Sequence, residues 1–405
     1  MNLFNPRTFS TDWEIMVIDK LDRLVESEKL MALAGLLRRE FDYPLDIDWM
    51  TLEFAMGINT SLDQIWERIQ QVTDRAAQVV REFDCELFPA GGHPLMPLYN
   101  ASHVHVGTIM NESQGIHLEN QMMKYVPVFG ALAANSPASR GQSGGFKSYR
   151  IRHQANGCTR PGFGRDPHLA QSTWGGDASP KMQGGLTMEV RILDCASSRR
   201  LLAEMATFVA AYVHYRGTRV EEYQPSPQEY EEHLTNRWAA SRYGLQATFC
   251  WDGATCPVVE ILDAMLDECA AELKDLGAKR SDLQLLNTMI EKRLCQADFV
   301  LDLATRYPDP WCLTSSYSKL VRHWDVFDEY LTTASPLEPA QPFNQESIVA
   351  EHLAVIGEGT HFYRSRETML YPPPVADALI ERMVEDGTIK REVTAERGIL
   401  LHRIA

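Results

Sequence analysis

The chain has 405 residues, of which 44% are hydrophobic and 23% are charged, as in ordinary globular proteins. This composition excludes a disordered chain, a collagen-like repeat and a small disulfide-rich scaffold. The formal net charge of −16 disfavours binding to nucleic acid and to anionic membrane surfaces. We therefore expect a large hydrophobic core and neither a nucleic-acid nor a membrane partner.

The eight cysteines and the apolar segments bear on the compartment. No two cysteines form a CxxC pair, which favours reduced thiols of the kind found in the cytoplasm. Residues 1–14 lack a basic segment followed by an apolar one, and the most apolar stretch, 201–213, is short and contains Glu204. We therefore expect a soluble, cytoplasmic protein.

The first half of the chain is predicted to mix strands and helices. Ser61 and Gln64 have the spacing of a capping box at the start of an amphipathic helix. A stretch of about fifty residues then shows little periodicity, and loops of that length are usually functional or disordered. We expect strands over 13–19, 46–56, 102–109 and 186–193, helices over 61–83 and 116–134, and the long loop over 135–186.

The second half is predicted to be helical. Apolar residues recur at helical spacing over 198–216, 227–243, 257–276, 280–305 and 316–332. We take 1–333 as the main domain, the proline-containing stretch 334–343 as a linker, and 344–405 as a small C-terminal appendage. A helix over 374–385 followed by a hairpin across 388–403 would make this appendage winged-helix-like.

Acidic residues gather on the first two predicted strands. Asp12 and Glu14 are two residues apart, so both side chains leave the same face of a strand. Paired carboxylates repel each other, and a divalent cation relieves that repulsion. Asp46, Asp48 and Glu53 on the next strand add further carboxylates. These residues are candidate metal ligands, although acidic residues facing solvent would give the same pattern.

His103 and His105 in SHVHVG also lie two apart, which places both imidazoles on one face of a short strand. Imidazole is a metal ligand and a proton carrier, but paired histidines also occur with ordinary hydrogen bonds. One family of metal hydrolases likewise opens with HxH on a strand. This motif alone leaves a metal-binding or proton-carrying site, a metal hydrolase and ordinary structural histidines open.

Glycines and cations occur together in the long loop. The segment NSPASRGQSGGFKSYRIR contains Gly141, Gly144 and Gly145 with Arg140, Lys147, Arg150 and Arg152. Glycines let backbone amides approach phosphate oxygens, and guanidinium groups hold phosphate or carboxylate at two points. Glu189 and Arg191 alternate on the strand that follows, which suits either an ion pair or phosphoryl transfer.

The assembled pattern resembles the type 2 glutamate–cysteine ligases, also called carboxylate–amine ligases, of the glutamine-synthetase-like superfamily. TDWEIMVID resembles the family's opening acidic strand, and DIDWMTLEFAMG resembles its second. The segments GGHPL, ASHVHVG, ALAANSPASRGQSGGFKSYR, TWGGDASP and LTMEVRILD follow in the family's order. The motifs cover about residues 10–215.

The resemblance implies an α+β fold, with a curved antiparallel sheet forming a funnel and helices outside it. It implies ATP and two or more Mg²⁺ ions as cofactors, and a small-molecule carboxylate and an amine as substrates. The implied reaction forms an amide, in some members γ-glutamyl, through an acyl phosphate. We also expect a homo-oligomer.

The resemblance also assigns roles by position. The implied metal ligands are Asp12, Glu14, Asp46, Glu53 and Glu189. The implied catalytic residues are Arg150, Arg191 and His105, and the implied nucleotide-binding residues are His103, Gly144, Gly145, Lys147 and Arg150.

The sequence departs from the family pattern at two positions. Asp12 replaces a glutamate, and Ser179 stands where the family has an arginine. Lys181 is only a partial substitute for that arginine, because an ammonium group lacks the planar two-point geometry of a guanidinium. The substrates need not be glutamate and cysteine. A metal-dependent hydrolase and a non-catalytic binding relative remain as alternatives.

Overall fold

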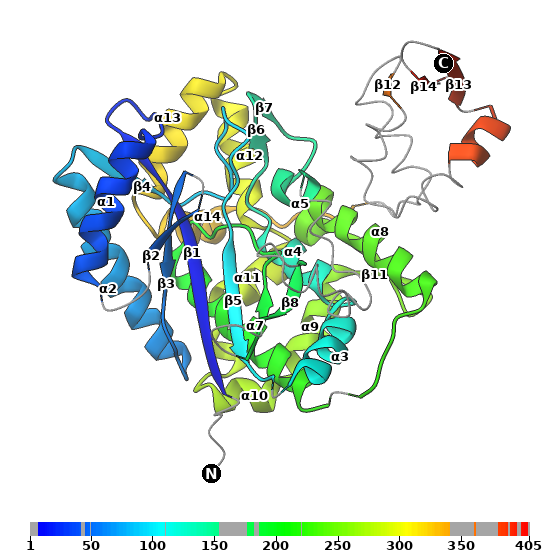
Figure 1. Cartoon of the computed structure of the whole chain (residues 1–405), viewed down its shortest axis with the longest axis horizontal. Helices are drawn as coiled ribbons and strands as arrows, with labels where there is room; N and C mark the ends of the chain where they lie inside the picture. The colour runs from blue at the N-terminus through cyan, green and yellow to red at the C-terminus, as the bar shows by residue number, and fades with distance from the viewer. Residues whose placement is uncertain are drawn as a thin grey trace.

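The computed structural model describes residues 7–41, 45–48, 50–109, 111–153, 176–181, 186–219, 221–340, 360–361, 380–387, 389–394 and 398–403. It combines a seven-stranded antiparallel sheet with many helices (Figure 1). The predicted mixture of helices with an antiparallel sheet is confirmed. No helix within these residues is both long enough and apolar enough to cross a membrane.

The central strand of the sheet is β1 (Thr8–Asp19), which pairs with three others. β3 runs along one edge of β1, and β5 and β4 share the opposite edge, because Asp12 pairs with both β3 and β5, and Met16 with both β3 and β4. The strand order is β2 (Leu45–Asp48), β3 (Thr51–Ala55), β1, β5 (Ser102–Gly107), β9 (Thr187–Val190) and β8 (Ala178–Lys181), with β4 (Cys85–Phe88) beside β1.

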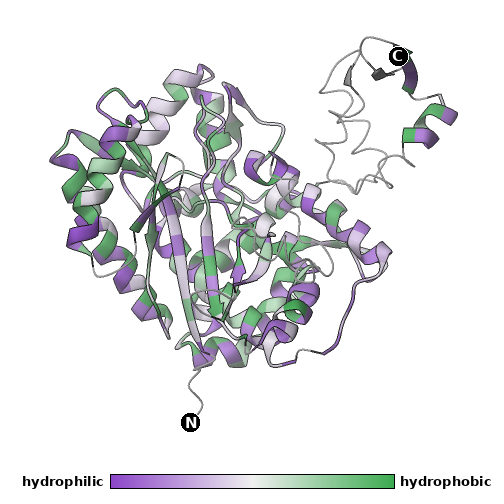
Figure 2. Ribbon diagram, viewed as in Figure 1, coloured by the Kyte–Doolittle hydropathy of each residue, from purple (hydrophilic) through white to green (hydrophobic). Residues whose placement is uncertain are grey.

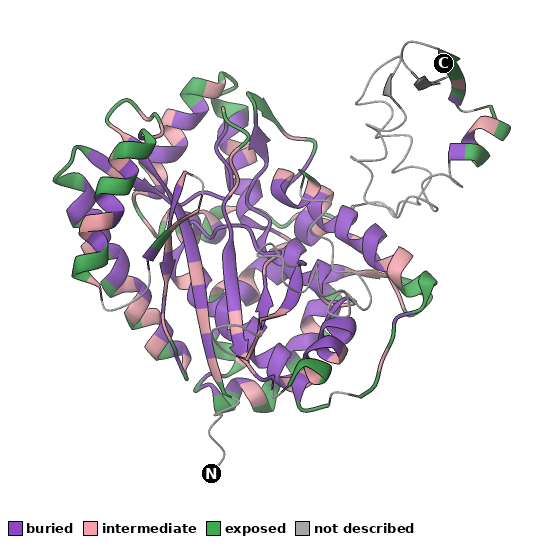
Figure 3. Cartoon of the chain, viewed as in Figure 1, coloured by how far each residue is buried: buried purple, intermediate pink, exposed green. Residues whose placement is uncertain are grey.

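The two faces of this sheet differ in polarity. Along the first half of β1, Phe9, Thr11 and Trp13 are buried, whereas Ser10 and Asp12 between them are only half-buried (Figure 3). Successive side chains on a strand point to opposite faces, so one face of β1 is apolar and the other is polar. Figure 2 shows the corresponding hydrophilic stretches in the middle of β1 and β5.

The apolar face packs against α7 (Arg199–Gly217), which contacts both β1 and β5. Nearly every residue of α7 is buried, including Glu204. The Glu204 carboxylate accepts hydrogen bonds from the backbone N–H groups of Leu285 and Leu286, at 2.9 and 3.1 Å. These N–H groups lie in the first turn of α11 (Gln284–Lys292), where helix N–H groups lack internal partners and favour a negative charge. The acidic residue inside an apolar segment therefore stabilises the start of a neighbouring helix.

The other helices surround this core. Ser61 accepts a hydrogen bond from the Gln64 N–H and so caps the predicted helix α2. The remaining helices are α1 (Ser27–Glu40), α2 (Leu62–Arg81), α3 (Glu112–Met122), α4 (Val126–Ala133), α5 (Tyr149–His153), α8 (Pro227–Tyr243), α9 (Val258–Glu268), α10 (Ala270–Asp275), α12 (Gln296–Arg306), α13 (Pro310–Val321) and α14 (Val326–Thr333).

Several predicted elements are shorter than expected. The predicted strand 46–56 is wrong as a single strand, because β2 and β3 pair with each other and the chain reverses between Asp48 and Thr51. The predicted helix 116–134 divides into α3 and α4, with Pro127 in the first turn of the second, since proline lacks the N–H that would continue the first. Within 280–305, α11 ends at Lys292, and Arg293, the residue that caps it, has a left-handed φ of 54°. The segments 257–276 and 316–332 also each contain two helices.

Some elements were not predicted. They include α1, β4 and the hairpin of β10 (Thr248–Trp251) with β11 (Ala254–Pro257). The hairpin turn is Asp252–Gly253, and both residues have positive φ, 50° and 76°. Asp-Gly between two strands is a strong sequence signal for this turn. The predicted loop 135–186 is also not a continuous loop, because its described residues contain β6 (Ala138–Ser139), β7 (Gln142–Ser143), α5 and β8.

The C-terminal segments form a small sheet of β12 (Thr360–His361), β14 (Gly398–Arg403) and β13 (Ile389–Thr394). β13 and β14 pair antiparallel, as the predicted hairpin requires, and 380–385 is helical. Residues 374–379 of the predicted helix lie outside the described residues, and the three-part division of the chain stays a prediction.

The first part of the predicted linker lies against the helical region. The Leu337 N–H donates to the Lys292 carbonyl at 2.8 Å, and the Ala340 N–H donates to the Gln246 carbonyl at 2.7 Å. The Lys292 ammonium in turn donates to the Leu331 and Ala334 carbonyls, at 2.6 and 2.9 Å, at the end of α14. Residues 334–340 are therefore hydrogen-bonded to the helical region instead of forming a free linker.

Candidate active site

The polar face of the sheet gathers side chains from five strands. Directly paired residues project from the same face, and Glu14 pairs with Glu53, Asp12 with His103, and Glu189 with both His105 and Ser179. We call this set the polar face: Asp12, Glu14, Glu53, His103, His105, Ser179 and Glu189. These positions are far apart in the sequence, and the antiparallel register brings them together.

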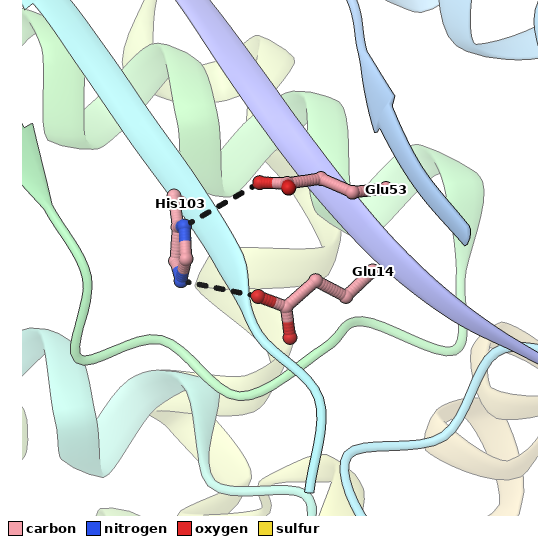
Figure 4. Close-up of side chains that lie close together, drawn as sticks. All are labelled: Glu14, Glu53 and His103. Carbon is pink, nitrogen blue, oxygen red and sulfur yellow. Dashed lines mark ion pairs between the residues drawn. The ribbon is translucent and has the colours of Figure 1, made fainter. Parts of the chain in front are cut away.

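One half of the polar face is an acidic cluster of Glu14, Glu53 and His103 (Figure 4). One nitrogen of His103 lies 3.5 Å from a Glu14 oxygen, and the other lies 4.0 Å from a Glu53 oxygen. One ligand atom from each of the three residues lies within 4.8 Å of the others, as a shared metal ion would require. The second Glu14 oxygen accepts a hydrogen bond from the Ala101 N–H at 2.6 Å, which fixes its orientation.

The carboxylates of this cluster lack sufficient positive charge. Burial raises the pKa of Glu14 to about 7. Burial also raises the pKa of Glu53 to about 8, with further contributions from the charges of Asp12 and Glu14. Burial lowers the pKa of His103 well below its ordinary value, so the imidazole does not supply the missing charge. The cluster therefore favours an added cation or protons.

The other half of the polar face is centred on Glu189. Its two oxygens lie 2.8 Å from an Arg191 guanidinium nitrogen and 2.9 Å from the Lys181 ammonium. Imidazole nitrogens of His105 and His103 lie 3.4 and 3.5 Å away. Burial would raise the pKa of Glu189, but the charges of Arg191, His105 and Lys181 outweigh burial and lower it. The charge of this carboxylate is already compensated.

Asp12 and His105 join the two halves. Their side chains form an ion pair at 3.0 Å. Burial alone would lower the pKa of His105, but the hydrogen bond to Asp12 and the charges of Asp12 and Glu189 raise it. His105 is therefore the imidazole of the polar face that holds a proton more readily.

Arg150 and Lys147 have other partners than a phosphate. The buried Arg150 guanidinium donates to the Ile192 carbonyl at 3.0 Å and the Arg191 carbonyl at 2.8 Å. It therefore braces the backbone immediately after β9. The Lys147 ammonium lies 2.6 Å from a carboxylate oxygen of Asp298, and both side chains are buried.

Gly144 and Gly145 follow a short hairpin of β6 (Ala138–Ser139) and β7 (Gln142–Ser143). Both glycines have positive φ, 81° and 85°, which favours glycine. The Tyr149 hydroxyl donates to the Gly144 carbonyl at 2.6 Å. Gly145 is exposed to solvent and Gly144 is half-buried, so their positions do not by themselves show contact with the polar face.

Asp46 lies apart from the acidic cluster. Its side chain is 76% exposed and pairs with Arg38 at 2.9 Å. Asp48, two residues later, is half-buried, and its charge contributes to raising the pKa values of Glu14 and Glu53. Of the acidic residues on β2, Asp48 is therefore the one coupled to the cluster.

Two buried acidic groups escaped the sequence reasoning. Asp194 accepts hydrogen bonds from the Asn135 N–H and the Ser136 and Ser148 hydroxyls, at 2.8, 2.8 and 3.0 Å. It ties the start of the glycine-containing loop to the chain after β9. Asp177 forms a buried two-point ion pair with Arg237 of α8. Arg237 beside Trp238 and two alanines was the available signal, because a buried guanidinium needs a carboxylate.

Two solved structures share this fold. The chain is similar to the structure of a glutamate–cysteine ligase from Francisella tularensis in complex with AMP, with a TM-score of 0.55 and 12% identity, covering 94% of this chain and 98% of that chain. It is also similar to a bifunctional glutathione synthetase from Pasteurella multocida, with a TM-score of 0.57 and 12% identity, covering 80% of this chain. This chain spans about half, 53%, of that bifunctional protein. The chain therefore shares the fold of these two proteins.

Sequence similarity narrows the class. Residues 97–155 match the model of glutamate–cysteine ligase family 2. The chain is 25% identical over 349 residues to "Putative glutamate--cysteine ligase 2" of Ralstonia pickettii, which covers 72% of this chain and 89% of that protein. It is 27% identical over 338 residues to the protein of the same name from Thermobifida fusca. The resemblance predicted from the sequence motifs is confirmed, and the chain is a carbon–nitrogen ligase similar to this family.

Proposed function

We propose that this protein uses ATP to join a small-molecule carboxylate to an amine, with an acyl phosphate as the intermediate. The observation that carries the proposal is the division of the polar face into an undercompensated acidic half and a half rich in cations. The similarity to proteins named glutamate–cysteine ligase and the AMP complex of a structural relative support it.

In the proposed reaction, a carboxylate oxygen of the acid attacks the γ-phosphorus of ATP and ADP leaves. The amine then attacks the carbonyl carbon of the acyl phosphate, inorganic phosphate leaves, and the amine nitrogen loses a proton. Phosphoryl transfer depends on positioning and on neutralising charge that develops on phosphate oxygens. Arg191, whose guanidinium donates to Glu189 of the polar face, is suited to that second role, because Glu189 holds it in place.

The residues present fit a divalent cation. Glu14, Glu53 and His103 would hold it, since their ligand atoms converge and burial disfavours both carboxylate charges without a cation. A bound Mg²⁺ would neutralise phosphate charge beside the acidic cluster. Asp12 pairs across the strands with His103, and Glu189 lies 3.5 Å from His103, so both adjoin this cluster, and a second ion remains part of the proposal.

Arg150 takes a positioning role in this scheme. Its guanidinium holds the carbonyls of residues 191 and 192, so it orients the chain that carries Arg191. We retain γ-glutamyl specificity, a cytoplasmic location and a homo-oligomeric state as predictions from the family resemblance.

The test is a screen of carboxylates and amines for ADP formation, combined with thermal unfolding in the presence of Mg·ATP. A ligand that binds the native state raises the melting temperature. We expect Mg·ATP to raise it, and ADP to form only when both an acid and an amine are present. Hydrolytic activity without nucleotide would contradict the proposal, and stabilisation by Mg·ATP without turnover across the library would favour a binding protein.

A further inference from the structure

The edge strand β8 places two polar side chains on the polar face. Ser179 pairs directly with Glu189, and Lys181 pairs with Thr187. Pro180, between them, points the other way, because a Cβ built on Gly115 of α3 would meet the Pro180 ring at 2.8 Å. Ser179 and Lys181 therefore project toward Glu189 and His105, roughly 7 Å apart along the strand.

The Ser179 hydroxyl has an unused hydrogen-bonding capacity. Its side chain is buried, at 3% exposure, and the hydroxyl oxygen has no hydrogen-bond partner among the described residues. A buried polar group without a partner is costly, and contact with a bound ligand would offset that cost. The hydroxyl can donate to an oxyanion.

Lys181 also has capacity to spare. Its ammonium carries three N–H donors, and Glu189 is the carboxylate with which it pairs, at 2.9 Å. The side chain is 28% exposed, so the ammonium is held in place by Glu189 but is not sealed away. Lys181 and Arg191 both contact Glu189, whereas Asp12, the next carboxylate of the polar face, pairs with His105. Two cations therefore share one carboxylate at this edge of the sheet, which favours an added anion there.

We propose that Ser179 and Lys181 form an oxyanion subsite of this enzyme. The subsite takes either a carboxylate of the acid or amine substrate, or a phosphate group of the nucleotide. This inference rests on the proposed function. The family resemblance expects an arginine where Ser179 stands, and a hydroxyl with a neighbouring ammonium offers separate single donors in place of a planar fork. The subsite therefore makes the recognition of this anion particular to this chain.

The experiment compares the wild type with the variants Lys181→Met, Ser179→Ala and Lys181→Arg in the full-length protein. Lys20→Met is the matched control, because Lys20 forms an exposed surface ion pair with Asp84. Isothermal titration calorimetry measures the dissociation constant of Mg·ATP for each protein. Steady-state ADP formation measures the KM of each substrate of the best acid and amine pair from the screen, and circular dichroism verifies that each variant is folded.

We expect Lys181→Met to weaken binding of one anionic ligand about ten- to a hundredfold, as for a lost charged hydrogen bond. Ser179→Ala should weaken binding of the same ligand by a smaller factor. Lys181→Arg, which keeps the positive charge, should bind that ligand nearly as tightly as the wild type. A raised KM for one substrate with unchanged nucleotide affinity identifies the substrate carboxylate. A raised dissociation constant for Mg·ATP identifies a phosphate.

Unchanged affinity for every ligand in folded, active Lys181→Met and Ser179→Ala proteins would overturn the subsite while leaving the proposed function intact. A wild-type protein that neither binds Mg·ATP nor forms ADP would instead overturn the proposed function. A similar loss in Lys20→Met would show that the effect is not specific to the subsite.

Discussion

Glu53 and Glu189 are the same residue type on one face of one sheet, yet their environments differ in opposite directions. Burial and neighbouring carboxylates raise the pKa of Glu53 to about 8. Arg191, His105 and Lys181 outweigh burial and lower the pKa of Glu189. The side chains on neighbouring strands therefore decide the state of each carboxylate. Glu53 needs an added cation, whereas Glu189 already pairs with cationic side chains.

The largest expected effect is that of Glu53→Gln, which removes the carboxylate with the raised pKa. Glutamine keeps the shape but removes the charge that would hold a divalent cation, so we expect ADP formation to fall at least about a thousandfold. Circular dichroism should show an intact fold, and stabilisation by Mg²⁺ in thermal unfolding should be lost. Glu40→Gln is the control, since Glu40 forms a surface ion pair with Arg75. Near-normal turnover by Glu53→Gln would contradict the assigned role.

A second prediction concerns an anchored carboxylate away from the cluster. Arg237 and Asp177 form a buried pair, and removing one member leaves the other charge buried without a partner. We expect Arg237→Ala to lower the free energy of unfolding by about 3–5 kcal/mol. Arg306→Ala, which breaks an exposed pair with Asp302, should change it by less than about 1 kcal/mol. Urea denaturation of both variants measures the difference, and equal effects would show that burial of the pair is unimportant.

The burial of histidine side chains predicts how the free energy of unfolding depends on pH. Burial lowers the pKa of His233 to about 4, below the value of about 6.5 in an unfolded chain. Between these values the unfolded chain binds more protons, so the free energy of unfolding falls as the pH drops from about 6.5 to about 4. Each such histidine contributes up to roughly 3 kcal/mol, and His93 and His214 are shifted in the same direction.

His233→Asn, which can keep the hydrogen bond to the Met123 carbonyl, should flatten this pH dependence. The exposed His323 provides the control, as His323→Asn should leave the slope unchanged. Chemical denaturation at several pH values checks both variants. Equal slopes in the wild type and His233→Asn would contradict the assignment.

The smallest effect is expected at Asp46, and this variant tests whether Asp46 belongs to the acidic cluster. Its exposed pair with Arg38 should contribute less than about 1 kcal/mol to stability. We expect Asp46→Asn to form ADP within about twofold of the wild type, in contrast to Glu53→Gln. A large loss of activity would show that Asp46 moves to bind metal.

The periodic elements and the paired motifs were accessible from the sequence. The spacing of Asp12 with Glu14 and of His103 with His105 placed each pair on one face, and the register of β1 with β5 shows how those faces coincide. Helix α2 was identifiable from its capping residues and apolar spacing. These features depend on local rules, which a sequence displays directly.

The partners of charged groups were not accessible. Nothing local indicates that Lys147 pairs with Asp298, about 150 residues later, or that Arg150 holds backbone carbonyls near 192. A cation in a glycine-containing loop looks equally suited to phosphate binding and to structural pairing. Asp46 and Asp48 were likewise indistinguishable in the sequence, because only the fold decides which of them turns toward Arg38.

The attachment of residues 334–340 has a practical consequence for truncation. A chain cut after residue 333 would lose the backbone bonds from Leu337 to Lys292 and from Ala340 to Gln246, together with the Ala334 carbonyl that Lys292 contacts. A chain cut after residue 340 would keep all three. To remove the C-terminal sheet for crystallisation or binding studies, the chain should therefore be cut after residue 340, so that the end of α14 stays anchored.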